Sequence, residues 1–505
     1  MKKKTLLLTA LLIGIAWDIL FWQKTPGISF PIFIMVCLTS GYLILRSENH
    51  RPSRRTYLLF LLLLLFSVGT CVRKDLLTTF LNVLLALFSI FILATTYKSG
   101  AWISFRVFDY VKNTLVGLGN MVTLPWKYLS GLRSKQGTEQ KEKNRELLWQ
   151  IIRGFLLAVP ILAVFTLLLS SADLVFEQHV QKIVSSFKIE KLSEYLVRGI
   201  LIFFVATFFI GIIQTAALRS HKPNQSNLDK PAISPFLGFT EGAIVLGSMI
   251  VLFTTFVIIQ FRYFFSGQMN ISFAGFTYAE YARRGFTELI AVAVFSLLLV
   301  QSLRTTLIFK KDKQRRYFAG LAAGLVLLVL VILASSFQRL SLYESAYGFT
   351  SLRTYSHVFI IWLGLLLIGT IVLEVLNKPR FFANAALLAI IGFSLSLNLL
   401  NVDAFIVHHN IKRANTAAEL DMHYLSNLSS DAVPALVEEF NSSQHSSDIH
   451  EAIGGVLKCH QLRMEDRSAT KTGWQSFHFS DWRVSRSISL VQEQIEEFDC
   501  TLIDW

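Results

Sequence analysis

Charged residues are scarce in this sequence. Only 16% of its 505 residues are charged, whereas 53% are hydrophobic and 42 are phenylalanine. A chain of this length made of soluble domains would need far more polar surface, so that organisation is excluded. Instead, several apolar runs reach the roughly 18–20 residues that cross a bilayer as a helix. The sequence therefore predicts an all-α, polytopic transmembrane helical bundle.

Motifs of catalysis and metal binding are also lacking. The sequence has no phosphate-binding loop, dinucleotide-binding glycine pattern, nucleophile elbow or H-E-x-x-H, and its histidines have no recognised zinc spacing. No soluble segment is basic and interleaved with aromatic residues, as nucleic-acid binding would require. We therefore predict no catalytic residue, no metal, no cofactor and no nucleic-acid partner, with the lipid bilayer as the main partner.

Eleven hydrophobic segments fit membrane spans. The true number could be one or two lower, because the first four segments are short or closely spaced. The first has a basic start, as a signal peptide does, but it lacks a small-x-small cleavage site and continues past Asp18, which favours an uncleaved span. The predicted spans are 5–22, 28–45, 57–72, 75–95, 149–170, 197–218, 236–262, 285–305, 317–336, 354–375 and 381–400.

Lysine and arginine are unevenly distributed along the chain. Up to residue 400 there are 40 basic and 18 acidic residues, whereas from residue 401 there are 8 basic and 16 acidic residues. A cytoplasmic N-terminus puts about 27 of the basic residues on the cytoplasmic side and about 12 on the other, as the positive-inside bias requires. With eleven spans, the acidic C-terminal region then lies outside the cytoplasm.

The sequence divides into four predicted regions. Residues 1–96 form a four-span region, and residues 97–148 combine a cytoplasmic interfacial helix, rich in Trp, Phe and Lys, with a basic linker. Residues 149–400 form a core membrane domain of about seven spans. Residues 401–505 form a small, mainly helical, extracytoplasmic region with apolar residues at helical spacing.

Two cysteines, Cys459 and Cys500, lie in the last of these regions. An oxidising compartment would permit a disulfide between them. Two cysteines alone determine neither proximity nor geometry, so the sequence leaves the pairing open.

Polar residues gather at four span ends on the predicted outer side. Charged groups near the hydrocarbon boundary are costly unless they are paired or hydrated, and they often mark functional sites. They could instead pin helices together as ion pairs and an aromatic belt, as Arg284 and Glu288 would at one helical turn. If they line an outward-facing cavity, the ligand-binding residues are Arg262, Tyr263, Tyr281, Arg283, Arg284, Glu288, Arg339, Tyr343, Glu344, Tyr347, Arg353, His357 and Asp403.

Several stretches carry a family resemblance: QFRYFFSG, YAEYARRGFTELIAV, LYESAYGFTSLRTYSH and NVDAFIVHHNIKRA. Together they resemble a bacterial family of polytopic membrane proteins known as a domain of unknown function, over roughly residues 150–440. The resemblance implies a multi-pass protein of the bacterial cytoplasmic membrane. It supplies no reaction, ligand or cofactor.

Three functions are compatible with these features. The first is transport or binding of a small polar, anionic or lipid ligand through the outward-facing cavity. The second is an envelope sensor or interaction scaffold that acts through a membrane or envelope protein partner. The third is a membrane-embedded enzyme with Glu288 or His357 as a base, for which the sequence indicates no nucleophile. We favour the first.

Overall fold

The fold is almost entirely helical. The computed structural model describes residues 3–131, 192–220, 235–264, 285–443, 445–469 and 473–500, and scattered positions between 150 and 180. In these ranges the strands are β1 (Leu237–Gly238) and β2 (Leu307–Ile308), which pair in parallel. Long apolar runs form helices because a helix satisfies its own backbone hydrogen bonds inside a bilayer. The predicted all-α, polytopic bundle is confirmed.

Most predicted spans correspond to a helix. Within the described residues, nine helices are long and apolar enough to cross a membrane, and a shorter apolar helix, α3 (Thr56–Val72), lies among them. Ten of the eleven predicted spans are thereby matched, and the other, 149–170, lies where the structure describes only scattered positions. The nine helices are α1 (Lys3–Phe21), α2 (Ser29–Ser47), α4 (Leu76–Thr96), α8 (Leu192–Gln214), α10 (Phe239–Phe264), α13 (Phe286–Thr306), α14 (Asp312–Tyr347), α15 (Ser351–Val375) and α16 (Phe382–Leu400).

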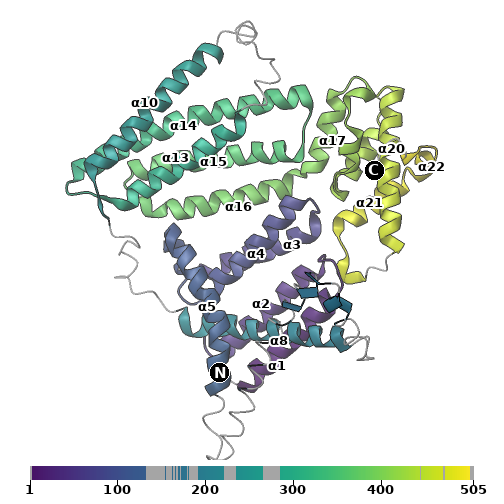
Figure 1. The fold of residues 1–505 in the computed structure, drawn as a ribbon, viewed down its shortest axis with the longest axis horizontal. Coiled ribbons are helices and arrows are strands. Elements are labelled where there is room, and N and C mark those ends of the chain that lie inside the picture. The colour runs from purple at the N-terminus through teal and green to yellow at the C-terminus, as the bar shows by residue number, and fades with distance from the viewer. Residues whose placement is uncertain are drawn as a thin grey trace, which may run out of the picture.

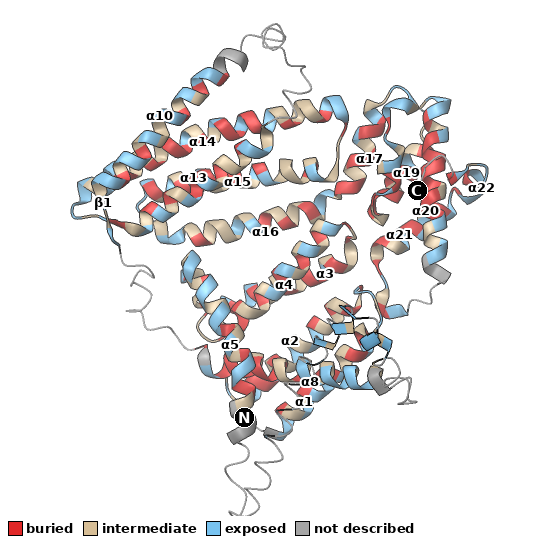
Figure 2. Ribbon diagram, viewed as in Figure 1, coloured by how far each residue is buried: buried red, intermediate tan, exposed pale blue. Residues whose placement is uncertain are grey.

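The spans form two groups that meet where α4 packs against α16 (Figure 1). One group contains α1 to α4 and α8, with Arg198 of α8 bonded to the buried carboxylate of Asp18 in α1. The other contains α10 and α13 to α16, and its centre includes the fully buried Ala322 and Leu325 of α14. Buried residues lie on the helix faces that turn toward other helices (Figure 2).

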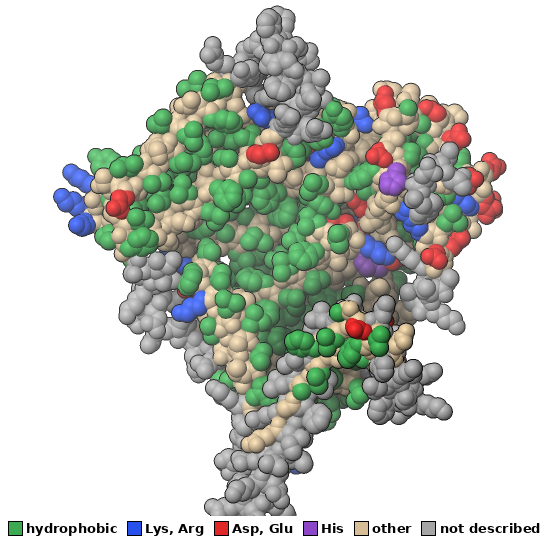
Figure 3. All heavy atoms as spheres, in the orientation of Figure 1, with side chains coloured by type: hydrophobic (Ala, Val, Ile, Leu, Met, Phe, Trp, Pro, Cys, Tyr) green, Lys and Arg blue, Asp and Glu red, His purple; other side chains and the backbone are tan. Residues whose placement is uncertain are grey.

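The outward-facing sides of the spans are apolar. Phe295 is 69% exposed and Leu252 is 58% exposed. Figure 3 shows a broad hydrophobic surface between a group of Lys and Arg at one end and a group of Asp and Glu at the other. So large an exposed apolar surface requires a nonaqueous environment, and a bilayer supplies one.

The span ends therefore define two sides. On the first, which we call the C-terminal side, the turns between spans contact the C-terminal helices: Ile28 N donates to Phe477 O at 2.8 Å, and Phe349 N donates to Asn410 Oδ1 at 2.6 Å. The opposite side, which we call the basic side, carries segments such as 310–316 and 378–380. This separation agrees with the predicted charge distribution, while the assignment of the basic side to the cytoplasm stays a prediction.

The C-terminal helices share one apolar core. Val433 and Leu436 are fully buried there with Val456 and Leu457. The end of the described chain is joined to this core by a disulfide between Cys459 and Cys500, whose Cα atoms lie 5.1 Å apart. The helices of this region are α17 (Val402–Arg413), α18 (Met422–Ser426), α19 (Val433–Phe440), α20 (Ser447–Ala469), α21 (Phe479–Ser489) and α22 (Gln492–Ile495).

Helix α14 is much longer than the span predicted within it. The predicted span ends at residue 336, where the apolar run ends, but the helix continues to Tyr347. At 36 residues it is about 54 Å long, compared with about 30 Å for the hydrocarbon core. The polar turns after residue 336 are good helix formers, so the helix carries Ser341 and Glu344 beyond the apolar run. Gly348 ends it at φ 80°, a conformation that favours glycine.

Helix α5 (Val107–Gly131) runs across the direction of the neighbouring spans in Figure 1. It crosses α8 at Gly211, where a Cβ atom would lie 2.1 Å from the carbonyl oxygen of Met121. Only glycine permits so close a crossing. The interfacial location predicted for residues 97–148 and the predicted region boundaries stay predictions.

Candidate functional site

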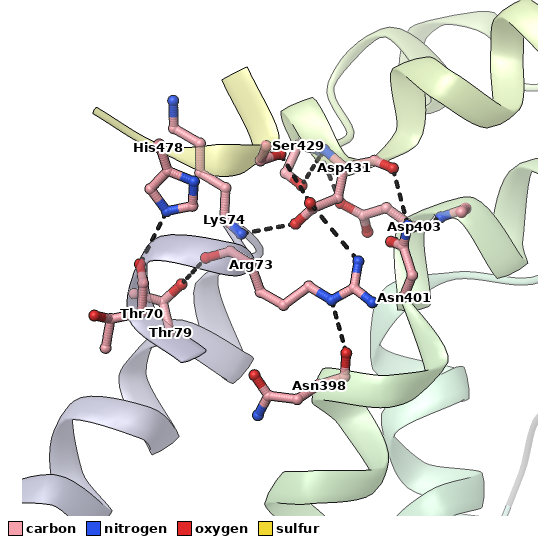
Figure 4. Close-up of polar contacts among 12 residues, drawn as sticks. Thr70, Arg73, Lys74, Thr79, Asn398, Asn401, Asp403, Ser429, Asp431 and His478 are labelled. Carbon is pink, nitrogen blue, oxygen red and sulfur yellow. Dashed lines mark hydrogen bonds and ion pairs between the residues drawn. The ribbon is translucent and has the colours of Figure 1, made fainter. Parts of the chain in front are cut away.

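A cluster of mostly buried polar residues joins the turn between α3 and α4 to the C-terminal helices (Figure 4). We call it the junction cluster, and its central member is Arg73, which is 7% exposed. Arg73 Nε donates to Asn398 O at 2.8 Å, and its Nη1 lies 3.9 Å from Asp431 Oδ1. Burial lowers the pKa of Arg73, and the nearby Asp431 carboxylate opposes that shift. The junction cluster comprises Arg73, Lys74, Asn401, Asp403, Asp431 and His478.

Lys74 forms the most direct bridge in this cluster. Its backbone N–H donates to Asp431 Oδ2 at 2.7 Å, and its Nζ donates to both carboxylate oxygens of Asp481 at 2.6 and 2.7 Å. Ser480 Oγ donates to the other oxygen of Asp431 at 2.8 Å. Two acids of the C-terminal region are thus held by one turn of the membrane region.

The start of α17 supplies the third component of the junction cluster. Asn401 adopts φ 50°, caps α17, and donates from Nδ2 to Asp431 O at 3.3 Å. Asp403 is 3% exposed and accepts from Ser429 N at 2.9 Å. Burial raises the pKa of Asp403 to about 6, although the hydrogen bond from Ser429 opposes the shift. The carboxyl group therefore titrates just below neutral pH.

His478 closes the cluster from the side of α21. Its Nε2 lies 2.9 Å from Thr70 O at the end of α3, so this nitrogen carries the proton. Burial lowers the pKa of His478 and favours the neutral ring. The junction cluster is a mainly satisfied polar network that fixes the C-terminal helices on the spans.

A separate groove lies where α14, α15, α16 and α17 meet on the C-terminal side. It has a volume of about 550 Å³, and its walls are mainly apolar. We call it the boundary groove, because it lies where the spans end. Its lining comprises Phe337, Ser341, Glu344, Ser345, Phe349, Thr354, His357, Val358, Ile361, Leu400, Phe405 and Arg413.

Three polar side chains form a hydrogen-bonded chain in the boundary groove. Ser341 Oγ lies 3.2 Å from His357 Nε2, and His357 Nδ1 lies 3.1 Å from Glu344 Oε1. Glu344 is 2% exposed, so its carboxylate depends on this partner. The ring of Phe337 packs edge-on against the imidazole, with centroids 4.5 Å apart, and fixes its orientation.

Arg413 brings a positive charge to the same groove. Its Nη2 donates to Glu419 O at 3.2 Å, and its Nη1 lies 3.5 Å from Ala346 O. Its Nε is buried and has no hydrogen-bond partner among the described residues. Arg413 therefore brings a partly exposed guanidinium to the lining of a mainly apolar groove.

Some of the predicted ligand-binding residues do come together. Glu344 and His357 both line the boundary groove. Beside them, the guanidinium of Arg353 lies 4.0 Å from the ring centroid of Tyr343, which contacts the ring of Tyr347 at 5.0 Å. The Arg353 guanidinium also donates to Gly348 O, so it stabilises the turn between α14 and α15.

Other predicted residues lie apart from the groove. Asp403 belongs to the junction cluster, and Glu288 is exposed in the first turn of α13. Arg339 lies beside the α13 start, because a Cβ atom on Gly285 would be 3.0 Å from its Nη1. The residues outside the described part of the chain are Tyr281, Arg283 and Arg284, together with the side chains of Arg262 and Tyr263.

Sequence reasoning missed Arg73, Lys74, Ser341 and Arg413. For the first two a signal existed, because VRKD places two cations in a short turn on the side where the positive-inside bias expects few. For Ser341 and Arg413 there was none, since a single serine or arginine forms no motif. Among the described residues, no group of His, Cys, Asp and Glu is arranged to hold a metal ion.

These features define an integral membrane protein with a helical region fixed on one side of its spans. The chain belongs to the family described as domain of unknown function DUF4153, whose family model matches residues 60–439. The match begins well before residue 150, so it includes α4 and most of α3 as well as the boundary groove. Neither a curated protein nor a solved structure matches the chain.

Proposed function

We propose that this protein binds an amphiphile, a molecule with an apolar chain and a polar or anionic head, in the boundary groove. The observation that carries the proposal is the composition of the groove. Apolar walls from four helices lead to the polar side chains of Glu344, His357 and Arg413. Its apolar part includes Ile361, within α15, and Leu400, at the end of α16, which are 51% and 37% exposed and would contact lipid.

The charges in the groove favour an amphiphile over a small polar solute. Glu344 and His357 satisfy each other, so Arg413 is the main charge left to attract an anionic head. A small solute would leave most of the wall without contact. Burial of an alkyl chain contributes about 25 cal/mol per Å² of apolar surface, which makes the walls the larger source of affinity. Movement of the amphiphile across the membrane stays a prediction.

The orientation proposed with this function places the C-terminal side outside the cytoplasm. The basic side then faces the cytoplasm, in agreement with the positive-inside bias. The disulfide between Cys459 and Cys500 supports the same orientation, because oxidising compartments lie beyond the cytoplasm. A reporter that is active only when exported should be active when fused after Trp505, and cytoplasmic activity at that position would contradict the orientation.

A second candidate function is sensing or scaffolding through a protein partner. The junction cluster supports it, because Lys74 and Asp431 connect the α3–α4 turn directly to the C-terminal helices. A partner that shifts those helices would pull on that turn. Purification in mild detergent separates the two functions: a stoichiometric protein partner favours sensing, and a retained amphiphile favours binding.

The binding proposal can be tested by filling the groove. Ile361→Trp puts a large ring into its apolar wall, whereas Ile368→Trp, two turns further along α15, makes the same change at an equally exposed position outside the groove. Native mass spectrometry of the purified proteins should show a bound amphiphile in the wild type and the Ile368 variant, and a clear loss in the Ile361 variant. Equal retention by all three proteins would overturn the proposal.

A further inference from the structure

We infer that the boundary groove is also a site of acyl transfer, in which Ser341 attacks a carboxylic ester of the bound amphiphile. The inference rests on the proposed binding function, because the groove must first hold the substrate. Its basis is the hydrogen-bonded chain from Ser341 through His357 to Glu344, which no sequence motif predicts.

The order of atoms in this chain is that of a nucleophile, a base and an orienting acid. The hydroxyl of Ser341 lies 3.2 Å from Nε2 of His357, and the carboxylate of Glu344 lies 3.1 Å from the opposite nitrogen, Nδ1. Such constellations are recognised by geometry and roles on unrelated folds. Here the long helix α14 supplies two members one turn apart, and α15 presents the imidazole to both.

The burial of Glu344 determines which ring nitrogen of His357 carries the proton. A carboxylate that is 2% exposed holds a proton on Nδ1 of His357, which leaves the lone pair of Nε2 facing Ser341. The hydroxyl of Ser341 also lies 3.1 Å from Phe337 O, the usual contact of a serine inside a helix. Rotation about the Cβ–Oγ bond moves the hydroxyl hydrogen from that carbonyl to Nε2, so both states are within reach.

The reaction follows from these positions. As Ser341 Oγ forms a bond to the ester carbonyl carbon, its proton passes to His357 Nε2 and negative charge develops on the carbonyl oxygen. Arg413 lines the same groove, and its positive charge stabilises this oxygen. The ester C–O bond then breaks, and the alcohol leaves with the proton from His357. Water attacks the acyl-serine with His357 as base, which releases the carboxylic acid and restores Ser341.

An alkyl fluorophosphonate tests this inference, because it labels a serine activated by a base. In the detergent-purified full chain we expect labelling of Ser341, located by peptide mass spectrometry. Ser341→Ala should abolish the label, and His357→Gln should slow labelling by about 100-fold or more. Ser356→Ala is the matched control: Ser356 comes directly before His357 on α15 but is not one of the residues that line the groove, and its hydroxyl donates to Leu352 O at 2.8 Å. Its labelling should equal that of the wild type.

Glu344→Gln tests the orienting role. As a positioning residue, Glu344 should change how the labelling rate depends on pH, because its loss removes the preference for a proton on Nδ1. An unchanged pH profile in a folded Glu344→Gln protein would contradict that role.

Two results would overturn the inference. One is a wild-type protein that retains its amphiphile in native mass spectrometry but takes up no label. The other is labelling of equal rate in wild type and Ser341→Ala. Neither result contradicts the binding proposal. That proposal fails if the wild type retains no amphiphile, or if the Ile361 and Ile368 variants retain it equally. Melting temperatures of all variants, measured alongside, separate a lost site from a lost fold.

Discussion

At the scale of single residues, the buried charges of this protein are concentrated where helices from different regions meet. Arg73, Asp403 and Asp431 are each at most 7% exposed. A buried charge is tolerated when hydrogen bonds and opposite charges surround it, and removal of one partner exposes the full cost of desolvation. These side chains should therefore control how firmly the C-terminal helices are held.

Arg73→Leu should destabilise the folded protein strongly. The substitution leaves the buried Asp431 without its nearby cation and leaves Asn398 O without its donor. Loss of one member of a buried charge pair lowers the free energy of unfolding by on the order of 3 kcal/mol. The loss should appear as a lower melting temperature in detergent. Arg316→Leu, an exposed arginine on the basic side, is the matched control and should melt near the wild-type temperature. Equal melting of the two variants would show that Arg73 is dispensable.

Asp403→Asn should alter the pH dependence of stability. Burial raises the pKa of Asp403 from 3.8 to about 6, so its stabilising contribution is present below pH 3.8 and is lost as the pH rises through about 6. Asparagine keeps the acceptor for Ser429 N and does not ionise. Relative to the wild type, the variant should be equally stable near pH 4 and more stable near pH 7, by on the order of 3 kcal/mol. Parallel melting curves across this range would contradict a raised pKa.

Residue-level chemistry was only partly predictable from the sequence. Glu344 and His357 stood out because charge near a hydrocarbon boundary is unusual, and the structure places both in one groove. Their partner Ser341 did not stand out, because a serine in a helix is ordinary until a base lies beside it. Arg353 stabilises the turn between α14 and α15, where its guanidinium lies over the ring of Tyr343. Which polar residues meet depends on helix packing, which local sequence does not encode.

At the scale of helices, α21 has two contrasting faces. Ser480, Val484 and Ile488 are buried on its inner face. On the outer face the guanidinium of Arg483 lies 4.6 Å from the ring centroid of Phe479, and Trp482 and Arg486 are exposed, as is Leu490 just after the helix. The chain just before this helix contacts the α1–α2 turn, so α21 begins at the level of the span ends. Aromatic and basic residues at that level are typical of the membrane interface.

Trp482 should therefore lie close to lipid head groups. In bilayers that contain brominated phospholipids, the part of the tryptophan fluorescence that is lost in Trp482→Phe should be quenched strongly by bromine near the head groups. Bromine near the end of the acyl chain should quench it weakly. If neither lipid quenches the Trp482 contribution, the outer face of α21 is turned toward water.

Helix boundaries were predictable only where hydropathy decides them. The apolar runs match the spans closely, because lipid contact and helix length are both properties of a single segment. The continuation of α14 to Tyr347 was missed, because a polar helix end and a polar loop have similar composition. That missed stretch contains Ser341 and Glu344, two of the polar residues that line the boundary groove.

At the scale of the whole molecule, the spans hold several of their turns against the C-terminal helices on one side. The turns between α1 and α2, α3 and α4, and α14 and α15 all meet the C-terminal helices. The acidic composition of residues 401–505 was visible in the sequence, but the contact between that region and three separate turns was not, because it depends on pairs of residues far apart in the chain. The boundary groove exists only through such contacts.

The most direct test of the central proposal is to find where a lipid touches the protein. A phospholipid analogue with a photoreactive diazirine in its acyl chain, activated in bilayers with the full chain, should crosslink preferentially to residues 337–361 and 400–413. Ile361→Trp should reduce that preference, while Ile368→Trp should not. Crosslinks spread over α10, α13 and the other exposed spans in proportion to their apolar surface, with no excess at the groove, would contradict the binding of an amphiphile there.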